Sequence, residues 1–199
     1  MKLPQPRFDQ TSSLEKALRE RRTVRSFRAD PLSIEQLSSL LWAAQGITED
    51  RGFKRSTPSA GALYPMDLYI AAGERSVTGL DAGVYHYQPA DDSLKRIWDG
   101  DARNELARAS LGQMWMSRAP INLVITAEYA RICGKYGDRG VRYAMIEAGH
   151  VGQNIFLQAE ALGLGAGIVG AFHDREVIQF LGLPQAHEPL LIMPVGRKR

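Results

Sequence analysis

The chain has 199 residues, of which 44% are hydrophobic and 24% charged, and this composition indicates a soluble globular protein with one sizeable core. Its net charge of +3 is dispersed apart from two basic runs, RERRTVR near the start and GRKR at the end, so it argues only weakly for nucleic acid and fits small anionic ligands at least as well. Without an apolar run near the ~18 residues of a membrane span or an apolar signal segment, and with the single cysteine Cys133, the sequence predicts one cytoplasmic domain, residues 1–199, with no internal disulfide and no membrane or nucleic-acid partner.

The first predicted element is a helix over residues 12–21. Ser12 and Glu15 have the spacing of a capping box, in which two side chains satisfy backbone amides of the first turn. Helical periodicity fades directly afterwards, in a basic run that contains Arg21, Arg22, Thr23 and Arg25. Three guanidinium groups and a hydroxyl at a helix end can hold a phosphate. They fit a solvated helix terminus equally well.

A second helix is predicted over residues 34–45. Ser33 and Gln36 form another capping box, and Gly46 has the position of a glycine just beyond a helix C-terminus, where left-handed backbone is common. The polar segment 47–62 that follows is expected to be a loop.

That loop ends in the sequence PSAGALYP, which begins at Pro58. Small residues let backbone N–H groups approach a flat or anionic ligand, and a serine adds a donor. The candidate ligand contacts in this segment are Ser59, Ala60, Gly61 and Ala62. An ordinary tight connection between two elements is the alternative explanation of the same composition.

Strands and one helix are predicted for the middle of the chain. A strand over 67–72 is followed by a hairpin, with strands over 84–88 and 94–98 and its turn at PADD. A third helix follows Asp101, with Leu111 among its inward-facing residues. The near-continuous apolar run INLVIT is typical of a central strand.

The segment 130–140 is expected to be mobile. It contains the adjacent residues Lys135 and Tyr136, which can act as a general acid or base where burial lowers the pKa of a lysine. A solvated loop is the alternative. A nucleophilic role for Cys133 is unsupported because no oriented base can be named for it. The histidines have no metal-ligand spacing, so no metal site is predicted.

The longest helical pattern, residues 141–162, is expected to form the spine of the core and the interface between two subunits. Its apolar positions recur near a 3.6-residue period and cover a stripe wide enough to predict burial on most sides. Gly149 and Gly152 each cost about 1 kcal/mol relative to alanine inside a helix, which close approach of another backbone would offset. Glu147 needs a partner if it is buried.

A glycine-rich run, GLGAGIVGAF, follows this helix. Gly163 is expected to end the helix. A short strand is expected next, and Gly165, Gly167 and Gly170 suggest that this strand faces a ligand, because a helix cap explains only the first glycine. The spacing does not match the dinucleotide-binding fingerprint, which lies between a first strand and a helix start.

The remaining elements are a strand over 166–170, a helix over 174–181 and a last strand over 190–195. Strands and helices are not in strict alternation along the chain. The pattern therefore predicts an α+β fold in which a mixed central sheet is flanked by helices.

In this order and spacing, the segments resemble the FMN-dependent nitroreductase superfamily, and within it the branch that contains the SagB-type azoline dehydrogenases. The resemblance covers nearly the whole chain and rests on the segments RRTVRSF, PLSIEQLSSLLWAAQGIT, PSAGALYP, GVYHY, KYGDRGVRYAMIEAGHVGQN, LQAEALGLGAGIVGAF and PVGR. It implies a homodimer with FMN at the subunit interface and the long helix at the centre of that interface.

The resemblance also assigns roles to individual residues. The flavin phosphate and ribityl chain would be held by Arg21, Arg22, Thr23, Arg25, Arg197 and Arg199. Backbone and small side chains near the flavin ring would come from Ser59, Ala60, Gly61, Ala62, Val169 and Gly170, the first four supplied by the second subunit. Lys135 and Tyr136 match the pair implicated in azoline oxidation, so they are the candidate catalytic residues.

Three functions remain open at this point. The first is an oxidoreductase that transfers hydride by a ping-pong route from NADH or NADPH through FMN to a small acceptor such as a nitroaromatic or a quinone. The second is a dehydrogenase that oxidises thiazoline or oxazoline rings in modified peptides, together with peptide-modifying partner proteins. The third is a flavin-binding dimer without catalysis, which Ala62 and Tyr64 allow because they depart from the Asn and Gln common in the family.

Overall fold

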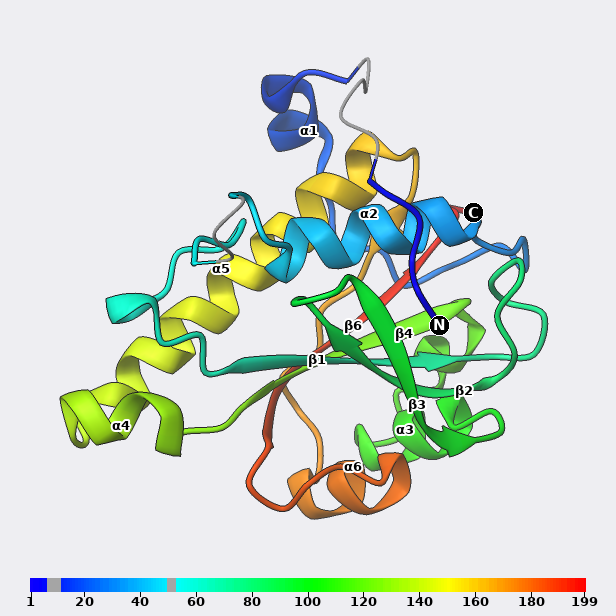
Figure 1. Ribbon diagram of the computed structural model, residues 1–199. Coiled ribbons are helices and arrows are strands. Elements are labelled where there is room, and N and C mark those ends of the chain that lie inside the picture. Colours follow the sequence, from blue (N-terminus) through cyan, green and yellow to red (C-terminus); the bar gives the residue numbers. More distant parts are fainter. Residues whose placement is uncertain (7–11, 50–52) are drawn as a thin grey trace.

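The computed structural model describes residues 1–6, 12–49 and 53–199, so part of the expected 47–62 loop lies outside the described residues. Its central feature is a six-stranded sheet in the order β3-β2-β1-β4-β6-β5 (Figure 1). The strands are β1 (Met66–Ala72), β2 (Gly83–Gln88), β3 (Ser93–Asp99), β4 (Ile121–Ala127), β5 (Gly165–Ala166) and β6 (Glu188–Gly196). Neighbouring strands pair antiparallel. The parallel pairing among the described residues consists of isolated bridges, such as Thr23 with Ala166.

Helices cover both faces of this sheet, which confirms the predicted α+β fold (Figure 1). One face carries α2 (Ile34–Gln45) and α5 (Arg139–Ala161), with α1 (Leu14–Glu20) packed on α5; the other carries α3 (Arg103–Ala109) and α6 (Asp174–Leu181). Side chains of β4 serve both layers, because alternate residues of a strand point to opposite faces. Leu123 and Ile125 pack with the α2 and α5 layer, and Val124 packs with the α3 and α6 layer.

Helix α2 occupies its predicted range. The Ser33 Oγ accepts a hydrogen bond from the Gln36 amide at 3.2 Å, and the Gln36 Oε1 accepts one from the Ser33 amide at 3.0 Å. The expected role of Gly46 is wrong, because its φ is −63° rather than left-handed. A Cβ at Gly46 would lie 2.2 Å from the Trp42 ring, so this glycine makes room for an aromatic side chain.

The N-terminal helix begins later than predicted. Ser13, not Ser12, is its N-cap, and the Ser13 Oγ accepts from the Lys16 amide at 3.2 Å. The sequence offers two adjacent serines, and only the chain entry into the helix selects between them. The expected inward position of Leu111 is also wrong: α3 ends at Ala109, and Leu111 has φ 55° and is 58% exposed.

The segment that was expected to be mobile contains a helix, α4 (Ala130–Tyr136). Ile132 on this helix is fully buried, and Cys133 and Tyr136 pack partly against the same core. These contacts explain why the segment is helical, because tertiary packing stabilises a short helix that is only marginally stable by its local sequence. No helix among residues 1–6, 12–49 and 53–199 has both the length and the apolar character needed to cross a membrane.

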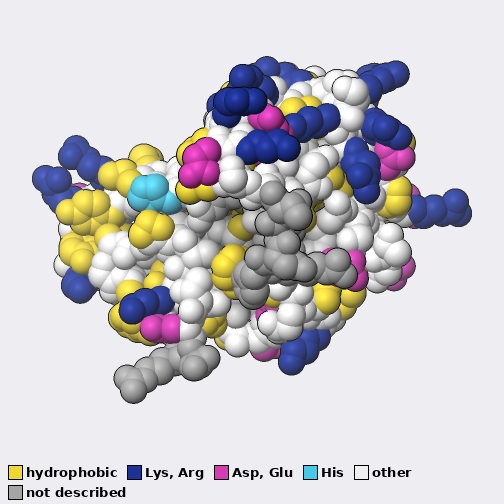
Figure 2. Space-filling model, turned by 90° about the horizontal axis from the view of Figure 1, so that it is seen from above, with side chains coloured by type: hydrophobic (Ala, Val, Ile, Leu, Met, Phe, Trp, Pro, Cys, Tyr) yellow, Lys and Arg dark blue, Asp and Glu magenta, His cyan; other side chains and the backbone are white. Residues whose placement is uncertain are grey.

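Helix α5 is buried along one side only, so the expected burial on most sides is wrong within one protomer. Its opposite side is a stripe, the α5 stripe, made of Met145, Ile146, Gly149, His150 and Gln153, all of them exposed. Met145 and Ile146 are 54% and 51% exposed. In the view onto this layer, hydrophobic side chains gather at the left, over the start of α5 (Figure 2).

Candidate functional site

The predicted ligand loop is a tight turn. Ala60–Ala62 form a 3₁₀ turn, η1, and three residues have left-handed backbone: Gly61 with φ 63°, Ala62 with φ 53° and Tyr64 with φ 46°. Left-handed backbone costs a non-glycine residue about 1–2 kcal/mol. Two such residues persist in one turn only if surrounding contacts hold it, and strain of this kind is common at functional sites.

Tyr64 supplies several of those contacts. Its amide donates to the Ser59 Oγ at 3.0 Å, which closes the turn. Its hydroxyl accepts from the Arg55 amide at 3.2 Å, and the Arg55 guanidinium lies 4.4 Å from the centre of its ring. The tyrosine therefore clamps this turn from inside the protomer.

The candidate catalytic pair lies directly against this turn. A Cβ at Gly61 would lie 2.7 Å from the Tyr136 hydroxyl and 3.0 Å from the Lys135 ammonium nitrogen. The Tyr136 ring packs edge-on against Tyr143 of α5, with ring centres 5.1 Å apart. The structure thus unites two groups that are far apart in sequence, and we call them the Gly61 cluster: Ser59, Ala60, Gly61, Ala62, Lys135 and Tyr136.

Lys135 is exposed in the protomer. The burial on which its expected acid–base role depends is therefore not supplied by its own chain. Its ammonium nitrogen lies 5.3 Å from the centre of the Tyr136 ring, and the ends of both side chains lie beside Gly61. A ligand or a second copy that covers the turn would provide the missing burial.

The basic residues from the two ends of the chain also come together. Arg28 N donates to Arg197 O at 3.0 Å, and Phe27 forms an antiparallel bridge with Lys198. Val24 N donates to Ala166 O at 2.9 Å, which places the same segment on the edge of β5. We call the following residues the terminal basic cluster: Arg21, Arg22, Thr23, Arg25, Arg197 and Arg199.

The arginines of this cluster are not paired with acidic side chains in the described part of the chain. Arg22 donates to two backbone carbonyls, those of Arg19 at 2.9 Å and Arg21 at 2.8 Å. Arg21 stacks over Phe156 at 5.1 Å. Such a group fits a phosphate, which would supply the missing negative charge.

Arg25 has a neighbour that the sequence analysis missed. Its guanidinium lies 5.8 Å from the centre of the Trp115 ring, and that ring also stacks with Phe27 at 6.4 Å. Trp115 lies in a short 3₁₀ segment, η2 (Met114–Arg118). No periodicity or spacing marks a lone aromatic residue in such a segment, so the sequence carried no signal for it.

Two glycines of the glycine-rich run, Gly165 and Gly167, are explained by packing within the protomer. A Cβ at Gly165 would lie 2.7 Å from the Val24 side chain, and a Cβ at Gly167 would lie 2.7 Å from Trp115. Packing within the protomer explains both glycines, and β5 is only two residues long. Gly163, with φ 68°, follows the helix end as predicted. Of Gly165, Gly167 and Gly170, only Gly170 is exposed, and no atom of the described residues lies within 4 Å of a Cβ placed there.

The Val169 amide, which was predicted to face a ligand, is already used within the protomer. It donates to Ile192 O at 2.8 Å, and the Val169 carbonyl accepts from Ile192 N at 2.9 Å. The side chain is 4% exposed. Within the described residues the Gly170 amide makes no hydrogen bond, so the expected donor role narrows to that residue.

The two clusters lie near opposite ends of α5. Arg21 stacks on Phe156 near one end, and Tyr136 packs on Tyr143 near the other. At 1.5 Å per residue, these two α5 residues are about 20 Å apart along the helix. One protomer therefore does not bring the terminal basic cluster and the Gly61 cluster to one point, although each is assembled by the fold.

Glu147 lies beneath the predicted ligand turn. It is 2% exposed, and neither carboxylate oxygen forms a hydrogen bond of good geometry among the described residues, although polar groups of Ser59 and Gln45 lie close to it. Burial raises the pKa of this carboxyl, and the nearby Ser59 and Gln45 side chains and the Arg55 charge only partly oppose that rise. A cavity of about 290 Å³ borders it, lined by Pro58, Ser59, Ala60, Tyr143, Ile146, Glu147 and His150.

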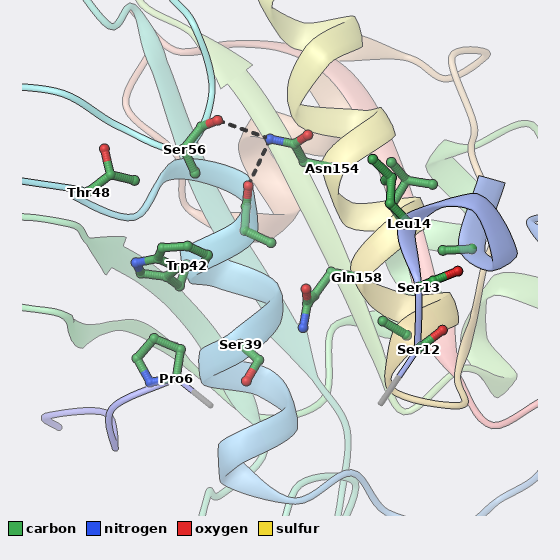
Figure 3. A pocket seen from close by; sticks show the side chains of 14 residues that line it. Pro6, Ser12, Ser13, Leu14, Ser39, Trp42, Thr48, Ser56, Asn154 and Gln158 are labelled. Carbon is green, nitrogen blue, oxygen red and sulfur yellow. Dashed lines mark hydrogen bonds between the residues drawn. The ribbon is translucent and has the colours of Figure 1, made fainter. Parts of the chain in front are cut away.

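Asn154 of α5 holds the chain that enters the turn. Its Nδ2 donates to Ala43 O at 3.0 Å and to Ser56 O at 3.4 Å (Figure 3). It also donates to Thr57 Oγ1 at 3.0 Å. Beside it, a cavity of about 570 Å³ separates α1, α2 and α5. Pro6 and Ser12 on its wall flank residues outside the described part of the chain, so we assign no site to this cavity.

One group of side chains has the composition of a metal site. Asp67, Glu128 and His187 place one ligand atom each within 4.8 Å of the others. The Arg131 guanidinium already lies between the two carboxylates, 2.7 Å from Asp67 Oδ2 and 2.6 Å from Glu128 Oε2. Because this cation supplies the positive charge that a metal would bring, the arrangement favours an ion-pair network.

Comparison with known proteins gives consistent matches. A sequence profile of the nitroreductase family matches residues 18–197. A candidate nitroreductase of Methanocaldococcus jannaschii is 49% identical over 93% of this chain and 91% of its own length. The microcin B17-processing protein of Escherichia coli is 28% identical over 83% of this chain, which spans only 62% of that relative. The crystal structure of a candidate nitroreductase from Ralstonia eutropha aligns with a TM-score of 0.86 and 29% identity, over 100% of this chain and 89% of the other.

Proposed function

The chain belongs to the nitroreductase family, and from this premise we propose that it is an FMN-dependent oxidoreductase that uses NADH or NADPH to reduce a small acceptor such as a nitroaromatic or a quinone. Two features of the protomer fit the flavin. The arginines of the terminal basic cluster lack carboxylate partners in the described residues, and Gly170 leaves open space beside an exposed backbone. When bound, FMN supplies the hydride transfer, and the protein holds and orients it.

The observation that carries the proposal is the division of the predicted site between two clusters about 20 Å apart along α5. A flavin that contacts both is most simply shared between two copies of the chain. The α5 stripe is exposed and apolar at Met145 and Ile146, and Gly149 leaves space for a second backbone. In this proposal each copy gives its terminal basic cluster to one flavin and its Gly61 cluster to the other.

Within such a site, the chain's residues have separate tasks. The terminal arginines bind the phosphate by charge-assisted hydrogen bonds. The Gly170 amide donates to the ring edge, where a fixed donor favours developing negative charge. Tyr136 and Lys135 present a hydroxyl and an ammonium group beside the Gly61 turn, where they can give protons to an acceptor.

Purification tests the cofactor first. The protein, as isolated or after incubation with FMN, is expected to show flavin absorbance that NADH or NADPH bleaches. A colourless protein that cannot be reconstituted would overturn the proposal. Bound FMN that neither nicotinamide reduces would favour a flavin-binding dimer without catalysis.

Mixing two inactive variants tests the shared site. One variant carries Arg197→Gln and Arg199→Gln, and the other carries Lys135→Ala and Tyr136→Phe. Random pairing after subunit exchange gives mixed dimers with one intact site, so activity should return to about a quarter of the wild-type value. No recovery, with exchange of subunits verified by mass, would show that each site lies within one copy.

A second function is favoured by the placement of Lys135 and Tyr136 at the Gly61 turn and by the likeness to a microcin-processing protein. In this reading the chain oxidises thiazoline or oxazoline rings in modified peptides, and the pair removes a ring proton. Turnover of an azoline peptide with FMN and oxygen tests it. Unchanged turnover in a Lys135→Ala, Tyr136→Phe variant would remove the pair from the mechanism.

A further inference from the structure

Arg131 contacts three parts of the chain at once. Its guanidinium binds Asp67 of β1 at 2.7 Å and Glu128, in the connection just before α4, at 2.6 Å. It also donates to the carbonyl of Tyr64, at the end of the predicted ligand turn, at 3.4 Å. The backbone adds a link at the same point, because Glu128 N donates to Pro65 O at 2.9 Å.

These contacts close a ring through the candidate site. Arg131 lies one helical turn before Lys135 on α4, and the pair at the end of α4 rests against Gly61. The turn around Gly61 leads back along the chain to Tyr64 and so to Arg131. The same guanidinium is therefore attached to both sides of the contact between the pair and the turn.

We propose that Arg131 is the positioning residue that fixes the Lys135–Tyr136 pair against the turn at residues 59–64. The positioning of the turn and the pair by Arg131 does not depend on what the protein does. Its catalytic consequence rests on the proposed function.

Asp67 is built to hold this arginine. Its side chain is 11% exposed. Burial alone would raise the pKa of its carboxyl, but the hydrogen bond from His86 and the charge of Arg131 lower the pKa overall. His86 Nε2 lies 2.8 Å from Asp67 Oδ1, and Gln88 orients the other nitrogen of this ring at 2.9 Å. His86 thus orients the carboxylate that Arg131 binds, and the charge of Arg131 helps to keep that carboxylate ionised.

Because the backbone of the turn is strained, its conformation depends on contacts such as the one from Arg131. Ala62 and Tyr64 both have left-handed backbone, which persists only where contacts over-determine it. Loss of the Arg131 contact removes one of them and frees the start of α4 at the same time. A residue that merely closed its own helix would affect α4 alone.

Hydrogen–deuterium exchange tests the structural part without reference to activity. Arg131→Gln is expected to raise exchange about tenfold or more in both the 59–65 and 131–137 segments, because a charge-assisted contact is lost at each. The matched control is Arg175→Gln, which removes the same charge from exposed α6 and should change neither segment. Faster exchange in α4 alone, or in neither segment, would overturn the proposal. If Arg131→Gln does not fold, Arg131→Lys keeps the charge without the fork, and the same two segments should change by less.

Kinetics of the FMN-loaded enzyme test the catalytic part. Arg131→Gln should lower kcat about tenfold or more with little change in KM for the nicotinamide, because misplacing a reacting group slows the chemical step. In a Tyr136→Phe, Lys135→Ala background the same change should have no further effect. Additive losses would show that Arg131 does not act through the pair. If the wild-type protein shows no turnover, the proposed function fails, while the exchange experiment still decides whether Arg131 positions the turn.

Discussion

Gly61→Ala is the most direct perturbation of the candidate site. Gly61 has φ 63°, where alanine costs about 1–2 kcal/mol more than glycine. The added Cβ would lie 2.7 Å from the Tyr136 hydroxyl and 3.0 Å from the Lys135 nitrogen. Ordinary contacts of these atoms are near 3.5 Å, so the tyrosine hydroxyl must move by roughly 0.5–1 Å.

The backbone strain should lower the thermal stability, and the displaced hydroxyl should lower the rate of turnover. Tyr136 and Lys135 meet the new methyl with the ends of long side chains, which can move, so the cost in stability is set mainly by the backbone. A loss of about 1–2 kcal/mol corresponds to a fall in Tm of about 2–8 °C for a chain of this size. The displaced hydroxyl should lower kcat of the FMN-loaded enzyme about tenfold to a hundredfold.

Thermal unfolding followed by circular dichroism and steady-state kinetics check this prediction. Ala62→Gly is the matched control for stability, because Ala62 has φ 53°, and the relief of strain there offsets the added freedom of the unfolded chain. Its Tm should change by less than that of Gly61→Ala. A Gly61→Ala variant with wild-type Tm and wild-type kcat would refute both the conformation of the turn and its contact with Tyr136.

The remaining predictions concern association, pH and packing. Gly149→Ala should stabilise a dilute protomer by about 1 kcal/mol, which corresponds to a rise in Tm of about 2–4 °C. The same change should weaken self-association about tenfold or more in sedimentation experiments, because the proposed second copy would use the open space beside Gly149. Unchanged association would show that α5 is not in the interface. Burial raises the pKa of Glu147, so the folded state binds its proton more tightly than the unfolded state, and the free energy of unfolding falls as pH rises through the raised pKa. Glu147→Gln removes that fall, so its gain in Tm over wild type should be larger above neutral pH than near about pH 4; an equal gain at both would contradict the shift. Gly46→Ala should lower the free energy of unfolding, measured with denaturant, by about 1–3 kcal/mol. The φ of Gly46 suits alanine, but the added methyl would lie 2.2 Å from the Trp42 ring. No change in stability would show that the ring has room to move.

Local signals in the sequence were enough for the elements that depend on near neighbours. The capping box of Ser33 and Gln36 placed α2 at its observed bounds, because both partners lie within one turn. The apolar run INLVIT identified β4 as a central strand, and each of its residues is buried. The α4 helix was missed because its stability comes from Ile132 and the distant core, which no local pattern reports.

The candidate site was predicted in its parts rather than in its geometry. Sequence position could not show that Gly61 and Tyr136 touch, since sheet order and α4 bring them together. Glycines misled in the opposite direction: Gly165 and Gly167 suggested a ligand, and the structure fills their space with Val24 and Trp115. A glycine indicates that another group lies close to the backbone, but the sequence does not show whether that group is a ligand or a side chain of the same protein.

That distinction decides how the glycines bear on function. The space beside Gly165 and Gly167 is already filled, so substitution there tests the fold. Among the described residues, no atom lies within 4 Å of a Cβ placed at Gly149 or Gly170. Gly149 lies inside α5, where a glycine costs about 1 kcal/mol relative to alanine. Gly149 faces outward on α5, and Gly170 offers an amide with no hydrogen bond among the described residues. Contacts among the described residues explain neither feature, whereas the proposed second copy would explain the first and the proposed flavin would explain the second. If a second copy packs on Gly149 and a flavin lies beside Gly170, then the variants at these two glycines must fail in different assays, Gly149→Ala in association and Gly170→Ala in flavin binding.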